Sequence, residues 1–285
     1  MTQLIVESPV ADAPPDSGGD GRFSARVGGG APVTATAAPC VLRERLDDGI
    51  EVLRLNRPRA RNALDTPMLR LLVATLDELA GDPSLRVVVF STTSTRALCS
   101  GIDIKEPLDH AGGVARMEAF MSFFAALDRC RVPTVGVCVG NCVGGGAEIV
   151  TGVDLRVGAT NLGVSWAGGR LGVPVGAARL VPLVGLSRAK ELIFSGRTVG
   201  VEEARDIGLL SRIAETDQAE AEGIAMAREV AIHPSEGIRR MKVMFRELER
   251  TGPRVAAENE ILLDWQIHGV GLPSGDPVVV APESV

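Results

Sequence analysis

The sequence predicts an α/β fold, and three observations lead to this class. From about residue 41 onward, short runs rich in β-branched residues alternate with amphipathic stretches, which is the pattern of α/β architectures. The chain has 285 residues, of which 45% are hydrophobic and 23% charged, so it is long enough to bury a full core. Aromatic residues make up only 3%, while glycine (33) and proline (17) are frequent. This composition predicts an aliphatic core in tightly turned elements.

The chain divides into four parts of different character. Residues 1–40 are rich in Gly, Pro, Ala and Ser and lack a sustained apolar period, so we expect a disordered tail. Residues 41–215 form the predicted α/β core, and residues 216–270 show an almost entirely helical pattern. Residues 271–285 contain three prolines and no charge pattern. We expect this last part to be a flexible extension.

The first elements follow from apolar patterns and turn residues. Residues 50–56 (IEVLRLN) form the first clear strand. Thr66 and Pro67 then predict an N-cap followed by proline at the first helical position, and leucines at three- and four-residue spacing continue this helix to Gly81. Residues 86–92 (RVVVFST) are long enough for a buried strand and too short for a helix.

The next elements lead to a glycine-rich loop. A second helix is predicted from about residue 114 to 130, because Met and Phe side chains recur there at helical spacing. Residues 133–139 (PTVGVCV) form the next strand, which runs directly into GNCVGGGAEIV. This segment is typical of a strand followed by a glycine loop and a helix. Beyond about residue 187 nearly all segments show helical patterns.

The glycine loop is a candidate functional site. Gly144–Gly146 precede Ala147 and Glu148 at a predicted helix N-terminus, where unpaired backbone N–H groups face whatever lies above them. Three glycines alone favour a plain tight turn, and the segment lacks both the P-loop and the dinucleotide-binding patterns. An acid in the first turn, beside such donors, indicates acid/base chemistry.

A second loop has a similar composition. Residues 97–106 (ALCSGIDIKE) follow the strand at 86–92. If both loops leave parallel strands at the same sheet edge, they face one ligand. Taken alone, this loop is better explained as a connecting turn in which Asp103 caps a helix.

Composition argues against several other functions. The net charge is −6 and the basic residues are scattered, which disfavours nucleic-acid binding. The five cysteines are odd in number and lack CxxC spacing, and only three histidines are present, so neither a disulfide framework nor a metal site is expected. Because we find no membrane-length apolar run and no signal-peptide pattern, we expect a cytoplasmic protein without membrane contacts.

Together these segments resemble the crotonase superfamily, also called the enoyl-CoA hydratase/isomerase family. The resemblance rests on the two loops, on LNRPRARNAL at residues 55–64 and on SGRTVGVEEARDIGLLSRI at residues 195–213, in the family's order. It extends from about residue 41 to about 250. It implies a crotonase-like spiral of ββα units with a helical C-terminal trimerisation region, assembled as a homotrimer or hexamer.

The resemblance also implies a chemistry. Family members bind acyl-CoA thioesters and stabilise a thioester enolate with two backbone N–H groups, which fall at Ile102 and Gly145 of this sequence. Fixed amide donors at a helix start suit this task, because they stabilise negative charge on the thioester oxygen without reorganising. Coenzyme A enters only as part of the substrate, so no separate cofactor is expected.

Further site residues are carried over by position. The resemblance places coenzyme A contacts at Arg59 and Ala60, near the adenine and phosphates, and at Ser100, Ile102 and Gly144. Arg61 is an alternative to Arg59, and either is also explained as a solvated surface residue. Ile104 and Trp166 are implied to line the substrate pocket.

The acidic residues depart from the hydratase pattern. Hydratases of this family use two glutamates, and Glu148 matches the first. The second should end an F-G-x-P-E motif, but the corresponding stretch is LGVSW, which puts Trp166 at that position. A shift of one residue in the alignment gives Ser165 or Ala167, neither of which is acidic. A single carboxylate makes efficient hydration doubtful, since one general acid/base group contributes roughly 10²–10⁴ in rate.

Several hypotheses of function follow. The leading hypothesis is an acyl-CoA-processing enzyme of the enoyl-CoA hydratase/isomerase type with Glu148 as acid/base. The missing second glutamate keeps open a one-base isomerase or decarboxylase, and also a non-catalytic acyl-CoA-binding homologue. Dehalogenation is disfavoured because Pro174 occupies the position of the nucleophilic aspartate. The C-terminal end also lacks the family's lysine-containing segment, which argues against the phosphate contact that this segment supplies.

Overall fold

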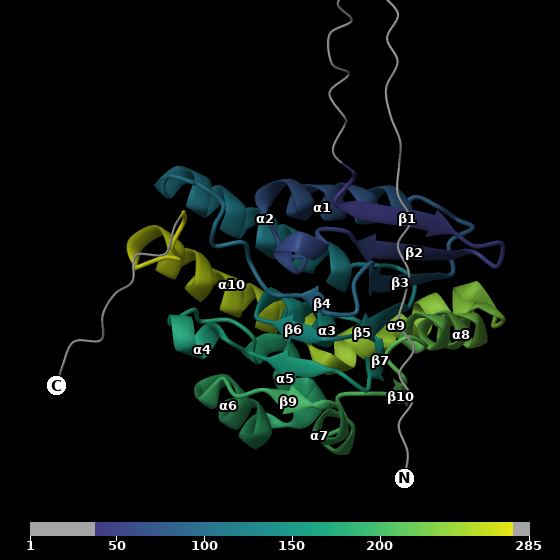
Figure 1. The fold of residues 1–285 in the computed structure, drawn as a ribbon. Coiled ribbons are helices and arrows are strands. Elements are labelled where there is room, and N and C mark those ends of the chain that lie inside the picture. The colour runs from purple at the N-terminus through teal and green to yellow at the C-terminus, as the bar shows by residue number, and fades with distance from the viewer. Residues whose placement is uncertain (1–37, 276–285) are drawn as a thin grey trace, which may run out of the picture. The chain divides into compact units, whose positions relative to one another are not determined.

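Two β-sheets form the centre of the structure, a computed structural model that describes residues 38–275 (Figure 1). The larger sheet has the order β1-β2-β3-β5-β7-β10 and is parallel except for the β1–β2 pair. The smaller sheet has the order β4-β6-β8-β9 and is parallel except for the β8–β9 pair. The strands are β1 (Val41–Arg45), β2 (Ile50–Leu55), β3 (Val87–Thr92), β4 (Ala97–Cys99), β5 (Thr134–Cys138), β6 (Asn141–Val143), β7 (Leu155–Ala159), β8 (Gly163–Ser165), β9 (Val199–Gly200) and β10 (Arg212–Ala214).

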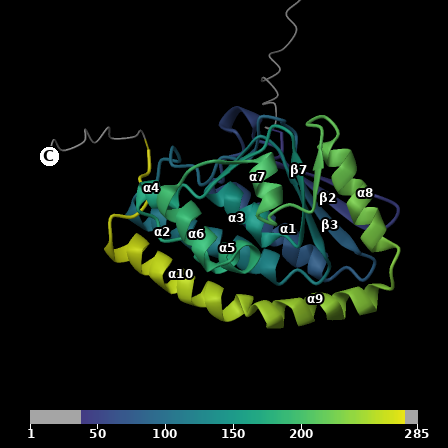
Figure 2. The same ribbon diagram turned by 90° about the horizontal axis from the view of Figure 1, so that it is seen from below.

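Helices follow the strands in a repeated unit. In each of β3–β4–α2, β5–β6–α3 and β7–β8–α4, the first strand joins the larger sheet and the second joins the smaller one. This is the expected spiral of ββα units, so the predicted α/β fold class is confirmed; that the helical C-terminal region forms a trimer stays a prediction. The helices are η1 (Pro58–Ala60), α1 (Thr66–Ala80), α2 (His110–Asp128), α3 (Gly145–Gly152), α4 (Gly168–Leu171), α5 (Ala177–Val184), α6 (Leu186–Ser195), α7 (Val201–Asp206), α8 (Ala219–Ala231), α9 (Ser235–Glu249) and α10 (Thr251–His268). In Figure 2, α9 and α10 run end to end along one side.

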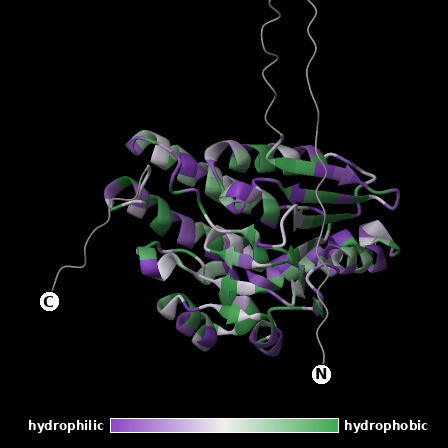
Figure 3. Ribbon diagram, in the orientation of Figure 1, coloured by the Kyte–Doolittle hydropathy of each residue, from purple (hydrophilic) through white to green (hydrophobic). Residues whose placement is uncertain are grey.

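The larger sheet is buried on both faces, as a parallel sheet requires. Alternate residues of β3 serve the two faces: Val87 and Val89 pack with α8, whereas Val88 and Phe90 pack with α1 and α2. The Phe90 ring lies 6.4 Å from that of Phe123 on α2. Figure 3 shows that the central strands are mostly hydrophobic. Burial on both faces explains why RVVVFST has no polar alternation.

Three boundaries differ from the sequence prediction. Helix α1 is capped by Asp65, whose carboxylate accepts from the Met68 amide at 2.9 Å, and not by Thr66. Helix α2 begins at His110, because Asp109 caps it, and two glycines in its first turn hide the apolar period. Residues 271–275, expected in a flexible extension, pack on the molecule through Leu272, which is only 8% exposed. The predicted tail at 1–40 lies almost entirely outside the described residues.

The loop between β2 and α1 is held by Asn62. This side chain is fully buried, and its backbone has a positive φ of 54°. Its amide group donates to Thr92 Oγ1 at 2.7 Å and to the carbonyl oxygens of Ala97 and Leu98 at 3.1 and 3.0 Å. Its oxygen accepts from the Arg57 amide at 2.7 Å. Asn62 therefore fixes the RPRARNAL loop against β3 and β4.

We predict that Asn62→Ala lowers the free energy of unfolding by about 3 kcal/mol, because it leaves several buried backbone groups without partners. The measurement is urea denaturation followed by circular dichroism. Asn56→Ala is the matched control, since this asparagine lies in the same loop and its hydrogen bonds are exposed. Equal losses in the two variants would contradict the anchoring role of Asn62.

Candidate active site

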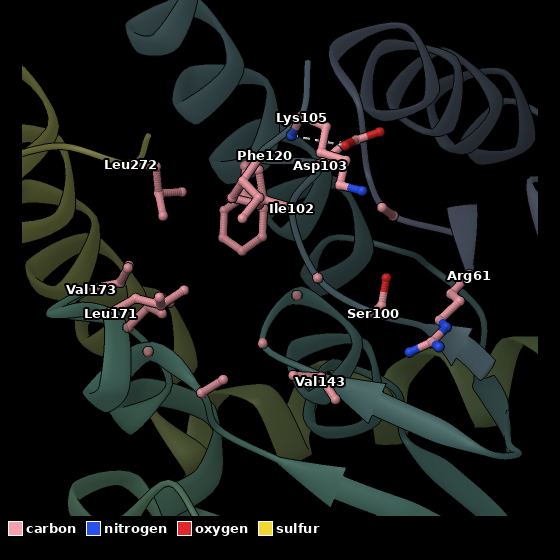
Figure 4. Close-up of a pocket in the computed structure, with 18 of the residues that line it drawn as sticks. Arg61, Ser100, Ile102, Asp103, Lys105, Phe120, Val143, Leu171, Val173 and Leu272 are labelled. Atoms are coloured by element: carbon pink, nitrogen blue, oxygen red, sulfur yellow. Dashed lines mark hydrogen bonds between the residues drawn. The ribbon is translucent and has the colours of Figure 1, made fainter. Parts of the chain in front are cut away.

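A cavity of about 490 Å³ lies where the loops after β2, β4 and β6 meet α2, α10 and the segment between α4 and α5. Its polar side includes Arg59, Arg61, Ser100, Asp103 and Lys105. The rest of the lining is mainly aliphatic or aromatic: Ile102, Ile104, Met117, Phe120, Val143, Leu171, Val173, Val175, Leu262 and Leu272. In Figure 4, Arg61 and Ser100 lie on one side, Leu171, Val173 and Leu272 on the other, and Ile102 and Phe120 between them.

The two predicted loops touch through backbone. Gly101 has a φ of +105°, and a Cβ atom there would lie 3.1 Å from the Val143 carbonyl oxygen and 3.7 Å from the Gly145 nitrogen. A Cβ atom on Gly145 would lie 3.5 Å from Gly101 Cα and 3.0 Å from Leu64 Cδ1. Glycine is required at this contact because any side chain would push the loops apart. The expectation that both loops leave parallel strands at the same sheet edge is confirmed, since the loops follow β4 and β6, which pair in parallel.

The Ile102 and Gly145 amides are free to bind a ligand. Leu64 donates to the Gly101 carbonyl at 2.8 Å and accepts from the Asp103 amide at 2.9 Å. In such a parallel bridge the intervening residue directs its own N–H to the opposite side, so the Ile102 N–H points away from Leu64. Gly145 is the first residue of α3, where an N–H has no partner in the helix. Neither N–H donates a hydrogen bond within residues 38–275.

Glu148 belongs to a buried charged cluster behind the cavity. It is 1% exposed, its Oε2 atom lies 3.5 Å from Arg179 Nη1, and its Oε1 atom has no partner among the described residues. Arg179 also binds Asp128 at 2.9 Å and stacks over the Phe124 ring at 5.0 Å. The Glu258 carboxylate accepts from the Gly176 and Ala178 amides at 3.1 and 2.8 Å, at the start of α5.

The cluster makes Glu148 a weak acid. Burial, and then the nearby negative charge of Glu258, raise the pKa of Glu148 from 4.5 to about 8, and Arg179 only partly opposes this shift. Three carboxyl groups share one guanidinium here, so retaining a proton on one of them is favourable. Glu148 is therefore mainly protonated at pH 7 and is suited to donate a proton.

Trp166 lies beside Glu148 and not in the cavity lining. It is 2% exposed, and its Nε1 atom has no partner among the described residues. A Cβ atom on Gly176 would lie 3.0 Å from Trp166 Cδ1 and 3.1 Å from Glu148 Oε1, so both side chains flank this glycine. Its neighbours Ala167 and Gly168 line the cavity in its place. The indole has turned into the core, where its large apolar surface is buried.

The structure brings together most residues that the sequence singled out. All the predicted coenzyme A and amide positions line the cavity, as does Ile104: Arg59, Ala60, Ser100, Ile102, Ile104, Gly144 and Gly145. Glu148 and Trp166 do not line the cavity; they lie in the layer of side chains behind its lining. Sequence reasoning missed Asp128, Arg179 and Glu258, because they come from three separate helices and no local motif links them.

Other reactive groups have no comparable setting. The thiols of Cys99 and Cys138 are fully buried, and burial raises the pKa of each to about 12, so they act as packing groups. No group of three or more His, Cys, Asp or Glu side chains within residues 38–275 is placed to hold a metal ion. None of the helices described is long and apolar enough to cross a membrane.

Known proteins resemble this chain in sequence and in fold. Residues 45–268 match a family described as enoyl-CoA hydratase/isomerase. The mitochondrial enoyl-CoA hydratase domain-containing protein 2 of Mus musculus is 32% identical over 242 residues, which cover 81% of this chain and 79% of that protein. A crystal structure of enoyl-CoA hydratase from Bacillus anthracis has a TM-score of 0.72 at 23% identity and covers 80% of this chain and 91% of its own. For a monofunctional enoyl-CoA isomerase from M. smegmatis the TM-score is 0.64 at 28% identity, with 76% and 98% covered.

We predict that Glu258→Gln lowers the pKa of Glu148 from about 8, because it removes a negative charge but keeps an oxygen for the α5 amides. NMR titration of protein with ¹³C-labelled glutamate carboxyls measures this directly. Wild-type stability should fall as pH rises from about 4.5 to about 8, since the folded state keeps a proton there that the unfolded chain releases. In Glu258→Gln this fall should end at a lower pH.

Glu260→Gln is the control for this experiment, because Glu260 lies on the same helix and is exposed. An unchanged Glu148 titration in Glu258→Gln would show that the two carboxyl groups do not interact.

Proposed function

The chain belongs to the enoyl-CoA hydratase/isomerase family, and on this premise we propose that it stabilises a thioester enolate at the Ile102 and Gly145 amides and transfers a proton through Glu148. The observation that carries the proposal is the pair of cavity-lining N–H groups that have no partner within the described part of the chain. Negative charge that develops on a thioester oxygen is stabilised by such fixed donors, and loss of one donor raises a barrier by about 2.7–4 kcal/mol.

The position of Glu148 on α3 supports its proposed role beside these amides. It follows Gly145 by three residues on α3, so both lie on the same helix face. Helical side chains lean toward the N-terminus, which directs the Glu148 carboxyl to the end of α3 that borders the cavity. Its Oε1 atom has no partner among the described residues, and the proposal requires this buried oxygen to reach a substrate carbon in the cavity.

A single acid/base favours double-bond isomerisation over hydration. Isomerisation of an enoyl thioester removes a proton from one carbon and returns it to another. One carboxyl group can do this in two steps, beginning with the ionised fraction of Glu148 as the base and continuing with the protonated acid. Hydration also requires a group that activates water. Trp166 lacks a basic atom. Of the two other carboxylates near Glu148, Glu258 already accepts two backbone N–H bonds and Asp128 is paired with Arg179. Decarboxylation, which needs the amide pair and a proton donor, is compatible with the same residues.

A non-catalytic acyl-CoA-binding protein is the second candidate. The 1% exposure of Glu148 and the loss of the second glutamate favour it. This candidate keeps the same ligand but predicts no turnover.

Coenzyme A would bind at the polar side of the cavity. Arg59, Arg61 and Lys105 line the cavity, are exposed and form no ion pair within residues 38–275. Free cations of this kind suit the phosphate groups of coenzyme A. The ligand is then the thioester itself, without a separate cofactor.

Self-association through α9 is also part of the proposal. One side of this helix exposes large apolar residues, and such a patch marks an interaction surface: Met241, Met244, Phe245 and Leu248. A homotrimer or a dimer of trimers, which the family resemblance implies, would cover it.

We predict that Glu148→Gln lowers turnover by roughly 10²–10⁴-fold with little change in thioester affinity, because the amide side chain fills the same space but cannot exchange a proton. The test is mass spectrometry of 2-enoyl- and 3-enoyl-CoA thioesters incubated with the protein in heavy water. Deuterium uptake and double-bond migration are expected for the wild type. Addition of water would identify a hydratase instead.

The control is Glu118→Gln, an exposed glutamate on α2. Tight thioester binding with no mass change and no double-bond migration in the wild type would favour the binding protein.

For the assembly, we predict that Phe245→Glu lowers the molar mass in solution toward 29.9 kDa, since a buried charge destabilises an apolar interface. Light scattering after size exclusion measures this mass. Arg240→Glu, on the same helix at a highly exposed position, should leave it unchanged. A wild type that is already monomeric at micromolar concentration would refute this part of the proposal.

A further inference from the structure

The chain after α10 turns back onto the cavity. Gly271 has a φ of +65°, which allows the turn. The Leu272 amide then donates to Gln266 Oε1 at 3.1 Å, and the Gly275 amide donates to the Ile104 carbonyl at 3.1 Å. Because Ile104 itself lines the cavity, residues 271–275 are bound to the cavity wall. We refer to these residues as the C-terminal strap.

Arg116 on α2 joins the strap to the loop that carries the Ile102 amide. Its side chain is 1% exposed, and its Nη1 atom donates to the Asp103 carbonyl at 2.7 Å. Its Nη2 atom donates to the Pro273 carbonyl at 3.4 Å and to Ser274 Oγ at 3.3 Å. The acceptors of this buried guanidinium lie on both the strap and the loop. It therefore holds the two segments together, because separating either one would leave a buried charge without its hydrogen-bond partners.

Leu272 is the strap residue that lines the cavity. It is 8% exposed, and the lining around it is apolar, with Met117, Phe120 and Leu262 contributed by α2 and α10. Figure 4 shows Leu272 on the side of the cavity away from Arg61 and Ser100, with Ile102 between. A thioester held at the Ile102 amide with its phosphates near Arg61 would therefore direct its acyl group toward Leu272.

We propose that the C-terminal strap closes the acyl end of the cavity and that Leu272 limits the length of the acyl chain, so that the substrates are aliphatic thioesters of limited chain length. Arg116 is a positioning residue that acts through the strap. This inference rests on the proposed function, because it assumes a thioester at the Ile102 and Gly145 amides. The inference adds the class of acyl group, because the two backbone amides bind the thioester oxygen and do not distinguish one acyl chain from another.

The test is calorimetric titration of saturated acyl-CoA thioesters from butyryl to dodecanoyl. In the wild type, affinity should rise about fourfold per methylene group while the chain fills apolar space, and then stop rising at the length where it meets the strap. Leu272→Ala should move this break to chains about two carbons longer, because it removes three carbon atoms from the wall. Leu272→Phe should move it to shorter chains.

Val270→Ala is the matched control, because Val270 is 95% exposed two residues before Leu272 and is not part of the lining. Its break should coincide with that of the wild type. Arg116→Gln should shift the break as Leu272→Ala does, and should accelerate amide hydrogen exchange at Leu272 and Gly275 at least tenfold.

The outcomes separate this inference from the proposed function. A break at the same chain length in the wild type, Leu272→Ala and Leu272→Phe would overturn the role of Leu272 and leave the proposed function intact. If the wild type binds no acyl thioester more tightly than free coenzyme A, the proposed function fails and the inference fails with it. Unchanged exchange at Leu272 and Gly275 in Arg116→Gln would show that Arg116 does not position the strap.

Discussion

The close contact between the backbones of Gly101 and Gly145 is the constraint on which the rest of the site depends. Gly101 occupies a conformation that disfavours side chains, and a Cβ atom on Gly145 would reach Leu64 and Phe120 at 3.0 and 3.2 Å. The parallel β4–β6 pairing brings the two loops to one sheet edge, and the Leu64 bridge then orients the Ile102 amide. Two neighbouring backbone N–H groups without partners among the described residues follow from this packing, without a specialised side chain.

Behind this contact lies a cluster of buried charged side chains, whose burial has to be compensated. Asp128, Glu148 and Glu258 surround Arg179, and each comes from a different helix. Full burial of so many charges would be costly, and the structure reduces the cost through hydrogen bonds from α5 amides and through a proton retained on Glu148. The same arrangement that makes the cluster tolerable gives Glu148 a pKa near the range where proton transfer is efficient.

Local signals in the sequence predicted much of the fold. RVVVFST is β-branched and apolar throughout because β3 is buried on both faces, and this identified a parallel strand. The leucine spacing identified α1. Its predicted N-cap was Thr66, but two adjacent polar residues can cap this helix, and in the structure Asp65 does so. The start of α2 was placed too late because Gly112 and Gly113 interrupt the apolar pattern, while the cap from Asp109 is a single side chain. Such boundaries depend on individual hydrogen bonds and not on periodicity.

The sequence by itself determined the two loops, the family and the positions of Ile102, Gly145 and Glu148. Each loop is a short run of consecutive residues, and the family follows from several such runs in order. Tertiary structure alone decided what surrounds them. Arg179 meets Glu148, Glu258 caps α5, and Arg116 binds the C-terminal strap across 157 positions of sequence. The Trp166 side chain is buried beside Gly176, and the C-terminal strap packs on the cavity. These contacts join segments far apart in the chain, and long-range packing leaves no periodic or local signal from which they could be read.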